Sequence, residues 1–234
     1  MNILAIDTSN HTLGIAVVQH EQIIGEYITT MKKNHSVRAM PAIEQLMNEC
    51  GLKPNQLDKI VVAKGPGSYT GVRIGVTIAK TLAWTLGIPI SGVSSLKALA
   101  ANGALFHGYI CPLFDGRRGQ IYTGLYRQIN GELACIKEDQ ILQSKDWALS
   151  MEALEEPILF IGDDASIHRD TLVEILGERA VFADPSIIYP RPGTLGLLGQ
   201  AEAEEDVHSF VPNYVRLAEA EANWIKEQKK ESAQ

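Results

Sequence analysis

The 234-residue sequence predicts an α/β protein made of two related subdomains. Three runs rich in β-branched residues open the chain, an amphipathic helix pattern follows them, and strand and helix patterns then alternate. A weaker copy of this order returns after about residue 105. The repeat is one of topology and not of residues. We assign residues 1–104 to a first subdomain and 105–193 to a smaller, degenerate second one, and we expect 194–234 to pack back on the first.

The first subdomain opens as an antiparallel meander, because short polar breaks are all that separate its three strand patterns. The period then becomes helical, with Val37, Met40 and Ile43 on one stripe, and Gly51 is placed to end the helix. The apolar run KIVVA is typical of a buried strand. The expected elements are strands at 2–7, 12–18 and 22–29, a helix at 36–50, a strand at 59–63, a helix at 71–86 and a strand at 88–93.

The second subdomain repeats this order with less regular patterns. Its expected elements are strands at 109–114, 120–126 and 132–136, a helix at 144–154, a strand at 158–161 and a helix at 167–176. The chain then continues through an apolar stretch at 194–203, an irregular segment containing VPNYVR, and a polar helix expected at 218–230.

Bulk composition predicts a soluble, cytoplasmic protein. Hydrophobic residues make up 45% and charged residues 21%, no run approaches the ~18 apolar residues of a membrane span, and the N-terminus lacks the pattern of a signal peptide. The three cysteines, Cys50, Cys111 and Cys135, are odd in number and widely spaced. They predict neither a disulfide framework nor a zinc site, and we expect reduced, mostly buried thiols.

The charge balance argues against strong nucleic-acid binding by this chain alone. Lys and Arg total 21 against 28 Asp and Glu, which gives a net charge of −7 that repels a phosphate backbone. The pair Arg117–Arg118 is a short basic cluster, and no larger one is present. A second protein would therefore have to supply most of the binding affinity for any nucleic acid.

The segment GPGSYTGVRIG, at 65–75, lies between a predicted buried strand and a predicted helix. Its glycines allow a tight turn and a close approach, and the start of the helix is a suitable place for an anion. The other interpretation, which we favour from the residues alone, is a tight connection with Ser68 or Thr70 as the helix N-cap. The spacing matches neither a Walker A loop nor a dinucleotide-binding fingerprint.

The opening LAIDTSNHTLGIAVV places polar residues where the first strand bends into the second. Such a hairpin can wrap phosphates with N–H and hydroxyl groups while its acid positions a magnesium ion. An Asx or ST turn that closes the hairpin explains the same residues, and the spacing does not choose between the two. The possible vestigial phosphate site comprises Asp7, Thr8, Ser9, Gly65, Gly67 and Ser68.

The sequence nominates no catalytic residue and no metal ligand. The six histidines are scattered without an HExxH or HxxxH pair, and no GxSxG marks a nucleophile. His35, just before a predicted helix, is expected to cap or stabilise its start.

Four segments together carry a family resemblance. LAIDTS at the start, HS at 35–36, GPGSYTGVRIG at 65–75 and PNYVR at 212–216 resemble the TsaB (YeaZ-like) family over the whole chain. This family serves the bacterial machinery that places threonylcarbamoyl on the adenosine beside the tRNA anticodon. The resemblance implies two βββαβαβα-type subdomains of the actin, hexokinase and heat-shock ATPase superfamily.

The TsaB family is a paralogue of TsaD, the subunit that catalyses the transfer, and two parts of the TsaD-like active site are missing here. Where TsaD-like proteins have GVNHLEGH, with two metal-binding histidines, this chain has GVSSLKAL and thus Ser95 and Leu99. Where they have ETSCDETG, with an active-site acid, this chain has DTSNHTLG and thus His11. Leucine cannot bind a metal and serine rarely does. The resemblance therefore implies a non-catalytic subunit and excludes a metal-dependent glycoprotease.

The resemblance also implies the partners. They are a TsaD-like catalytic subunit, a TsaE-like ATPase and a second copy of this chain, with tRNA reached indirectly through the complex and no membrane. No cofactor is expected on this chain, and ATP and metal are expected on the partner subunits. The alternative is a stand-alone small kinase or ATPase of the same superfamily. An adenosine motif in the second half would support it, but only GDDAS at 162–166 is found, and such a turn is more often structural.

The helices expected at 36–50 and 71–86 are apolar over more of their circumference than one packed face requires. The excess is either a partner surface or a surface covered by the rest of the chain, and the resemblance favours the partner. Small residues such as Gly75 and Ala79 would allow close helix approach. The predicted interface comprises His35, Val37, Met40, Pro41, Glu44, Val72, Arg73, Gly75, Val76, Ala79 and Lys80.

Overall fold

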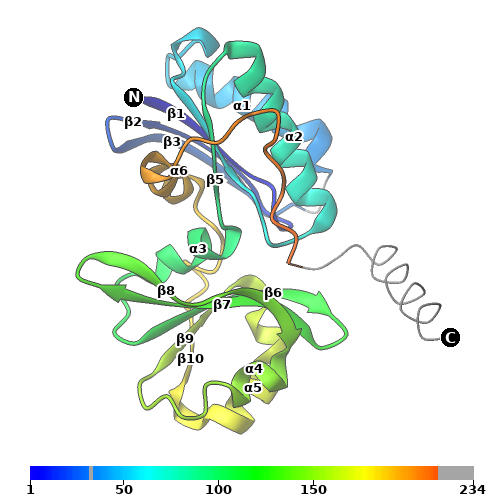
Figure 1. The fold of residues 1–234 in the computed structure, drawn as a ribbon, viewed down its shortest axis with the longest axis vertical. Helices are drawn as coiled ribbons and strands as arrows, with labels where there is room; N and C mark the ends of the chain where they lie inside the picture. Colours follow the sequence, from blue (N-terminus) through cyan, green and yellow to red (C-terminus); the bar gives the residue numbers. More distant parts are fainter. Residues whose placement is uncertain (32–33, 216–234) are drawn as a thin grey trace, which may run out of the picture.

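The computed structural model describes residues 1–31 and 34–215 and contains two five-stranded sheets. The sheets belong to two halves that lie one above the other along the long axis of the molecule (Figure 1). The helix predicted at 218–230 lies outside the described residues. Among the described helices, none has the length and apolar character needed to cross a bilayer.

The first sheet has the strand order β3-β2-β1-β4-β5. Its strands are β1 (Asn2–Asp7), β2 (Leu13–Gln19), β3 (Gln22–Thr29), β4 (Lys59–Ala63) and β5 (Ile90–Val93). The first three form an antiparallel meander, whereas β4 and β5 continue the sheet in parallel to β1. All five residues of β4 are buried, as expected for a parallel strand covered on both faces.

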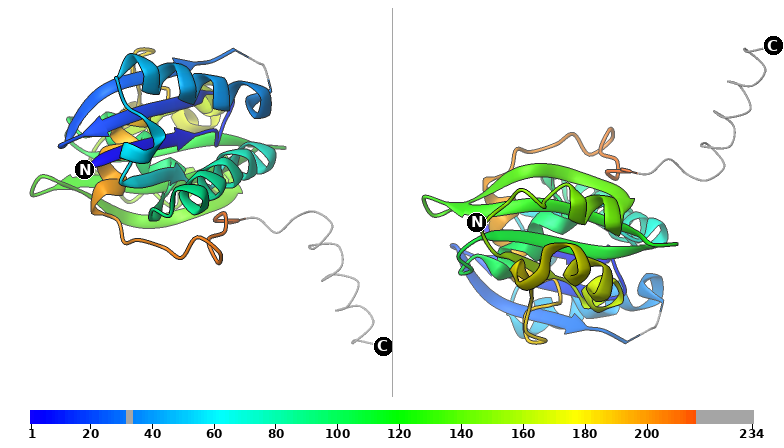
Figure 2. Two further views of the ribbon diagram at one scale, coloured as in Figure 1. Left: turned by 90° about the horizontal axis from the view of Figure 1, so that it is seen from above. Right: turned by 90° about the horizontal axis from the view of Figure 1, so that it is seen from below.

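Alternating side chains of this sheet build two cores. Leu4 and Ile6 of β1 face α1 (His35–Glu49) and α2 (Tyr69–Leu86). Ile3 and Ala5 face the opposite way, toward α6 (Pro192–Ala201). The helix α6 contacts all five strands, so the chain returns to the first half after completing the second. Figure 2 shows α6 and the α1–α2 pair on opposite faces of this sheet.

The second sheet repeats the first strand for strand. Its order is β10-β9-β6-β7-β8, with β6, β7 and β8 antiparallel and β9 and β10 parallel to β6. The strands are β6 (Tyr109–Arg117), β7 (Gln120–Ile129), β8 (Glu132–Gln143), β9 (Ile158–Ile161) and β10 (Ala180–Phe182). One face packs on α4 (Ser144–Leu149) and α5 (Arg169–Leu176), while the other packs on α3 (Ser95–Ala100). The predicted two-subdomain α/β fold is thus confirmed.

Several predicted bounds need correction. The elements α3 and β10 are absent from the prediction, and the helix predicted at 144–154 ends at Leu149. The helix predicted at 167–176 is preceded by a 3₁₀ segment and starts at Arg169. Of the thiols, Cys111 is buried, but Cys135 is exposed on β8. The short 3₁₀ turns are η1 (Pro54–Gln56), η2 (Ala101–Gly103), η3 (Asp163–His168) and η4 (Gly177–Arg179).

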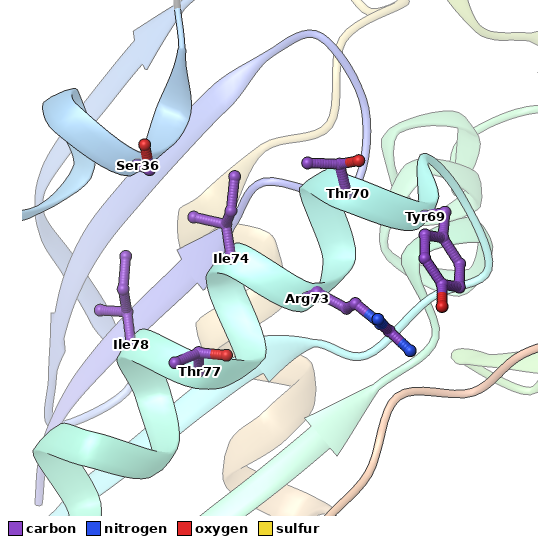
Figure 3. A pocket seen from close by; sticks show the side chains of 7 residues that line it. All are labelled: Ser36, Tyr69, Thr70, Arg73, Ile74, Thr77 and Ile78. Atoms are coloured by element: carbon purple, nitrogen blue, oxygen red, sulfur yellow. The ribbon is translucent and has the colours of Figure 1, made fainter.

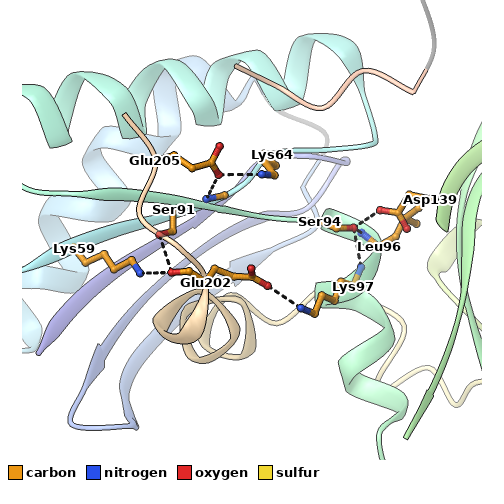
Figure 4. A network of polar contacts seen from close by, with 10 residues as sticks. Lys59, Lys64, Ser91, Ser94, Leu96, Lys97, Asp139, Glu202 and Glu205 are labelled. Atoms are coloured by element: carbon orange, nitrogen blue, oxygen red, sulfur yellow. Dashed lines mark hydrogen bonds and ion pairs between the residues drawn. The ribbon is translucent and has the colours of Figure 1, made fainter. Parts of the chain in front are cut away.

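Residues 202–213 form a strap along β5, the edge strand of the first sheet (Figure 4). Glu205 forms a β-bridge with Ile90, and its carboxylate accepts hydrogen bonds from Lys64 Nζ (2.9 Å) and Gly92 N (3.2 Å). The carbonyl of Glu202 accepts from Lys59 Nζ at 2.9 Å. The strap thereby pairs the β5 edge that would otherwise be open.

Asp139 of β8 ties the two halves together. Its carboxylate accepts hydrogen bonds from Ser94, the N-cap of α3, and from Tyr126 at 2.5 Å (Figure 4). Ser94 Oγ also accepts from Leu96 N and Lys97 N at 3.1 Å. Burial raises the pKa of Asp139. The start of α3 is therefore fixed to the second sheet through one partly buried carboxylate.

The packing of α6 on the first sheet generates the first prediction. A Cβ at Gly199 would overlap the side chain of Val61, with the two Cβ atoms 3.0 Å apart. We expect Gly199→Ala to lower the free energy of unfolding by about 1–3 kcal/mol through overpacking, although alanine is the better helix former. Urea denaturation measures this free energy. The matched control, Gln200→Ala, should have a free energy of unfolding within ~0.5 kcal/mol of the wild type. Equal stability of the two variants would contradict this packing.

Candidate functional site

The glycine-rich loop packs directly on the backbone that follows β1. Ser68 N donates to the Ser9 carbonyl at 2.7 Å, and Thr8 Oγ1 donates to the Gly71 carbonyl at 2.7 Å. A Cβ at Gly67 would overlap the Ser9 carbonyl oxygen, and one at Gly71 would overlap that of Thr8. The glycines are therefore required for backbone-to-backbone contact.

The hydrogen bonds of the two turns match the sequence interpretations that require no ligand, namely a helix N-cap and an Asx turn. Ser68 is the N-cap of α2, and its hydroxyl accepts from Gly71 N at 3.3 Å, which confirms the predicted capping role. Asp7 Oδ1 accepts from Ser9 N at 2.8 Å, which is the Asx turn considered from the sequence. His35 is the first residue of α1 and not its cap, which is Asn34. Its Nε2 lies 2.9 Å from the Asn10 carbonyl and so braces the hairpin instead.

The predicted phosphate residues do not share one open surface. Asp7, Thr8 and Ser9 are at most 2% exposed. Gly65 is also buried, and a Cβ there would lie 2.8 Å from the Asn213 carbonyl oxygen of the strap. Of the six residues, Gly67 and Ser68 line the cleft described below. The close approach of the loop to the hairpin leaves no room for a phosphate between them.

Several buried polar atoms around this contact lack a hydrogen-bond partner among the described residues. They are Asp7 Oδ2, Ser9 Oγ, Thr12 Oγ1 and His35 Nδ1. Burial raises the pKa of Asp7, opposed by its hydrogen bonds with Ser9 and by the charge of His35. Unpaired polar groups of this kind are costly and often mark functional or formerly functional sites.

A cleft of about 620 Å³ separates the glycine-rich loop from the second half. Apart from Arg117, its charged and imidazole side chains contact other groups of the chain. His168 Nε2 lies 3.1 Å from Asp115 Oδ1, and Asp164 Oδ2 accepts from Asp115 N at 2.9 Å. The residues that line it are Asn10, His11, Asn34, His35, Gly67, Ser68, Tyr69, Thr70, Gly71, Ile74, Phe114, Asp115, Gly116, Arg117, Tyr122 and Asp164.

The positions of the TsaD-like metal ligands are filled by packing. Ser95 is fully buried, and its hydroxyl accepts from Gly65 N at 3.1 Å. Leu99 is also fully buried, in the apolar cluster where α3 meets the second sheet. His11, at the position of the missing acid, lies 3.3 Å from Asp163. Within residues 1–31 and 34–215, no group of three or more His, Cys, Asp or Glu side chains is arranged to hold a metal.

A second candidate surface runs along α1 and α2. A hollow of about 440 Å³ follows the outer face of α2 (Figure 3). It is lined by Ser36, Tyr69, Thr70, Arg73, Ile74, Thr77 and Ile78. A second, largely apolar hollow of about 490 Å³ lies between α1 and the end of α2. Its lining includes Met40, Pro41, Glu44, Met47, Leu82 and Leu86.

The strap fixes one end of this surface. Arg73 Nε donates to Tyr214 Oη at 2.6 Å, and the guanidinium carbon lies 4.1 Å from the centre of the Tyr69 ring. The rings of Tyr69 and Tyr214 are 5.4 Å apart. This cation–π cluster connects the start of α2 with the PNYVR motif, the last residue of which, Arg216, lies outside the described part.

The structure divides the predicted interface residues into three groups by their exposure. Val37, Met40, Pro41, Glu44 and Arg73 are exposed. Lys80 is half-buried, and its Nζ donates to the carbonyls of His208 and Phe210. The remainder face the chain's own core, which corrects their assignment to an open surface. These buried residues are His35, Val72, Gly75, Val76 and Ala79.

These residues are buried because α2 has two apolar stripes and the inner stripe covers the sheet. Ala79 is 0% exposed, and a Cβ at Gly75 would lie 2.5 Å from Thr8 Oγ1. The outer stripe contains Ile74 and Ile78, which the prediction did not include. Their spacing of four residues, which places them on one face of the helix, could have identified this outer stripe from the sequence.

Comparison with known proteins agrees with this architecture. The family described as "TsaD: tRNA N6-adenosine threonylcarbamoyltransferase" matches residues 22–224. The protein of Bacillus subtilis (strain 168) named "tRNA threonylcarbamoyladenosine biosynthesis protein TsaB" is 56% identical and covers 98% of this chain and 100% of that protein. The protein of the same name from Escherichia coli (strain K12) is 29% identical and covers 65% of this chain and 69% of its own length.

A solved structure shows the same fold. YeaZ from Pseudomonas aeruginosa is 26% identical, with a TM-score of 0.76 over 91% of this chain and 99% of that one. The repeated sheet topology and the match at residues 22–224 define a two-subdomain protein related to the tRNA threonylcarbamoyltransferases. Within that class, the chain belongs to the TsaB (YeaZ) family.

Asp7 generates a pH-dependent prediction. Because its pKa is raised above the ordinary 3.8, stability is lost as the pH rises from below 3.8 through the raised folded value. Asp7→Asn removes the buried charge and keeps an acceptor for Ser9 N. We expect the variant to be more stable than the wild type at about pH 7.5 and the gain to disappear near pH 3, measured by urea denaturation.

Asp184→Asn is the control of opposite sign. The hydrogen bonds with Ser186 lower the pKa of Asp184, so this carboxylate contributes stability above its ordinary pKa that is lost on acidification. Its removal should reduce stability at about pH 7.5 and have no effect at low pH. A difference between Asp7→Asn and wild type that does not change with pH would refute an ionised, buried Asp7.

Proposed function

We propose that this chain is the non-catalytic subunit of a tRNA threonylcarbamoyladenosine-forming complex. Membership of the TsaB family supports a role in the biosynthesis of that modified nucleoside. The proposed role is to pair with a TsaD-like subunit, which carries the catalysis, and to support recruitment of a TsaE-like ATPase. ATP and metal then belong to the partner subunits, and the complex works in the cytoplasm.

The observation that carries the non-catalytic assignment is the packing at Ser95 and Leu99. A metal site needs side chains that donate lone pairs into an open coordination space. Here the Ser95 hydroxyl oxygen accepts a hydrogen bond from Gly65 N, and Leu99 lies inside an apolar cluster. Restoring a site would require two substitutions and the removal of buried packing.

The proposed partner surface is the exposed part of the α1–α2 face. Val37 is 69% and Met40 is 44% exposed, and the two hollows lie on the same pair of helices. An exposed apolar surface on a soluble protein commonly marks a protein interface. The same self-complementary face would serve the homodimer and, because TsaD is a paralogue, the heterodimer.

The stand-alone kinase or ATPase predicted as the alternative has less support. It would need the hairpin after β1 to hold phosphates, whereas Thr8 and Ser9 are buried against the glycine-rich loop. The measurement that tests it is ATP hydrolysis by the purified chain with magnesium. Turnover that disappears in a correctly folded Asp7→Asn variant would support the kinase and contradict our proposal.

The interface is tested by placing a charge on its exposed apolar residues. We expect Val37→Glu and Met40→Glu each to weaken self-association and TsaD binding by at least about tenfold, since the carboxylate would be desolvated without a partner. Sedimentation velocity measures both. Ala79→Glu would report on folding instead, because Ala79 is fully buried.

Ile167→Glu is the matched control. Ile167 is 63% exposed and lies in η3 of the second half, outside both hollows of the α1–α2 face. It should leave both associations unchanged. If Val37→Glu and Met40→Glu are folded and bind both partners as tightly as this control, the α1–α2 face is not the interface.

A further inference from the structure

The turn between β6 and β7 presents two adjacent arginines, Arg117 and Arg118, at the rim of the cleft. Both side chains are exposed. Arg117 lines the cleft, opposite the N-terminus of α2. In a chain of net charge −7, this pair is the only place within residues 1–31 and 34–215 where two Lys or Arg residues are adjacent.

These two arginines differ from the rest in having no partner. Eight arginines fall within the described residues, and six of them contact another side chain or a carbonyl. Their partners are Tyr27 for Arg38, Tyr214 for Arg73, Glu156 for Arg127, Phe182 for Arg169, Leu176 for Arg179 and Glu26 for Arg191. For Arg117 and Arg118, the described part of the chain contains no hydrogen bond or ion pair to the guanidinium groups.

The backbone holds the turn firmly. Arg117 N donates to Asp115 Oδ1 at 3.2 Å, and the Gly119 carbonyl accepts from Ser144 N at 2.9 Å. Arg117 and Arg118 have φ values of 66° and 54°, a region that arginine rarely adopts. The β2–β3 turn also has two residues of this kind, so the backbone alone does not indicate a ligand. The backbone conformation does, however, hold the two unpaired guanidinium groups on a hairpin that hydrogen bonds fix in place.

The nearby carboxylates are already engaged. Asp115 pairs with His168 and Arg117 N, Asp164 accepts from Asp115 N, and Asp163 pairs with His11. Their negative charge disfavours an anion deep in the cleft. An anion would instead bind at the rim, where the arginine side chains are exposed. The start of α2, which lines the same cleft, adds a partial positive charge.

We propose that the Arg117–Arg118 turn contacts the phosphate backbone of the tRNA substrate in the assembled complex. Guanidinium groups bind phosphate oxygens through paired, charge-assisted hydrogen bonds. Two such contacts cannot hold tRNA against the overall negative charge of the chain, so the contact operates only when a partner subunit brings the tRNA. This inference rests on the proposed function, because it requires that the chain act within a tRNA-modifying complex.

The experiment uses the complete reconstituted complex and measures threonylcarbamoyl transfer to tRNA at several salt concentrations. The variant Arg117→Gln/Arg118→Gln should raise the KM for tRNA about tenfold, the lower end of the range for charge-assisted contacts, with kcat unchanged. The log–log salt dependence of tRNA binding should become shallower by about one for each lost phosphate contact. Arg117→Lys/Arg118→Lys should recover most of the binding.

Lys53→Gln/Arg127→Gln is the control, because it also removes two positive charges but at positions away from the turn. Both residues are outside the cleft, and Arg127 lies toward the other end of β7. The KM of this control should match that of the wild type. A rise in KM equal to that of the turn variant would mean that net charge alone decides tRNA binding and would overturn the proposed contact.

Other outcomes separate the two proposals. If the turn variant assembles and its KM and salt dependence match the wild type, the tRNA contact is wrong and the proposed function stands. If the folded variant fails to assemble with the TsaD-like subunit, the turn is a protein contact and the tRNA contact is again wrong. If the wild-type chain neither assembles nor supports transfer, the proposed function itself fails.

Discussion

The contact between the glycine-rich loop and the backbone after β1 is the constraint on which the rest of the first half depends. Ser68 N donates to the Ser9 carbonyl, and Gly67 and Gly71 leave no space for a side chain between the two segments. Any larger residue there would push α2 away from the sheet. The contact therefore positions α2, and through α2 it positions the outer stripe of that helix and the cleft wall.

The same loop is held from its other side by Ser95 of α3 and by the strap. Ser95 accepts from Gly65 N, and Asn213 of the strap donates to the Lys64 carbonyl. A loop that packs on the hairpin, on α3 and on the strap has little freedom to open around a ligand. The superfamily frame is thus kept as a rigid scaffold. In this chain the space beside the loop is filled by Ser95, the strap and the hairpin.

The sequence predicts the strands far better than the surfaces. The β4 run KIVVA and the β9 run ILFI match the predicted bounds, because short apolar runs between polar breaks have few alternatives. The helix α3 was missed because its six residues are nearly all buried and show no amphipathic period. Periodicity also identified α2 as apolar on two stripes, but it cannot tell that Ala79 faces the sheet. The cleft joins residues from both halves, which only the fold brings together.

The two candidate surfaces lie on different halves, and this separation has a consequence for assembly. The α1–α2 face belongs to the first half, whereas Arg117 and Arg118 extend from the second sheet beside the cleft. The two surfaces adjoin at the start of α2, because Tyr69, Thr70 and Ile74 line both the cleft and the hollow on that helix. Asp139, bonded to Ser94 and Tyr126, fixes the two halves relative to each other. Under the two proposals made above, this rigid link would hold the arginine turn at a set position relative to the α1–α2 face.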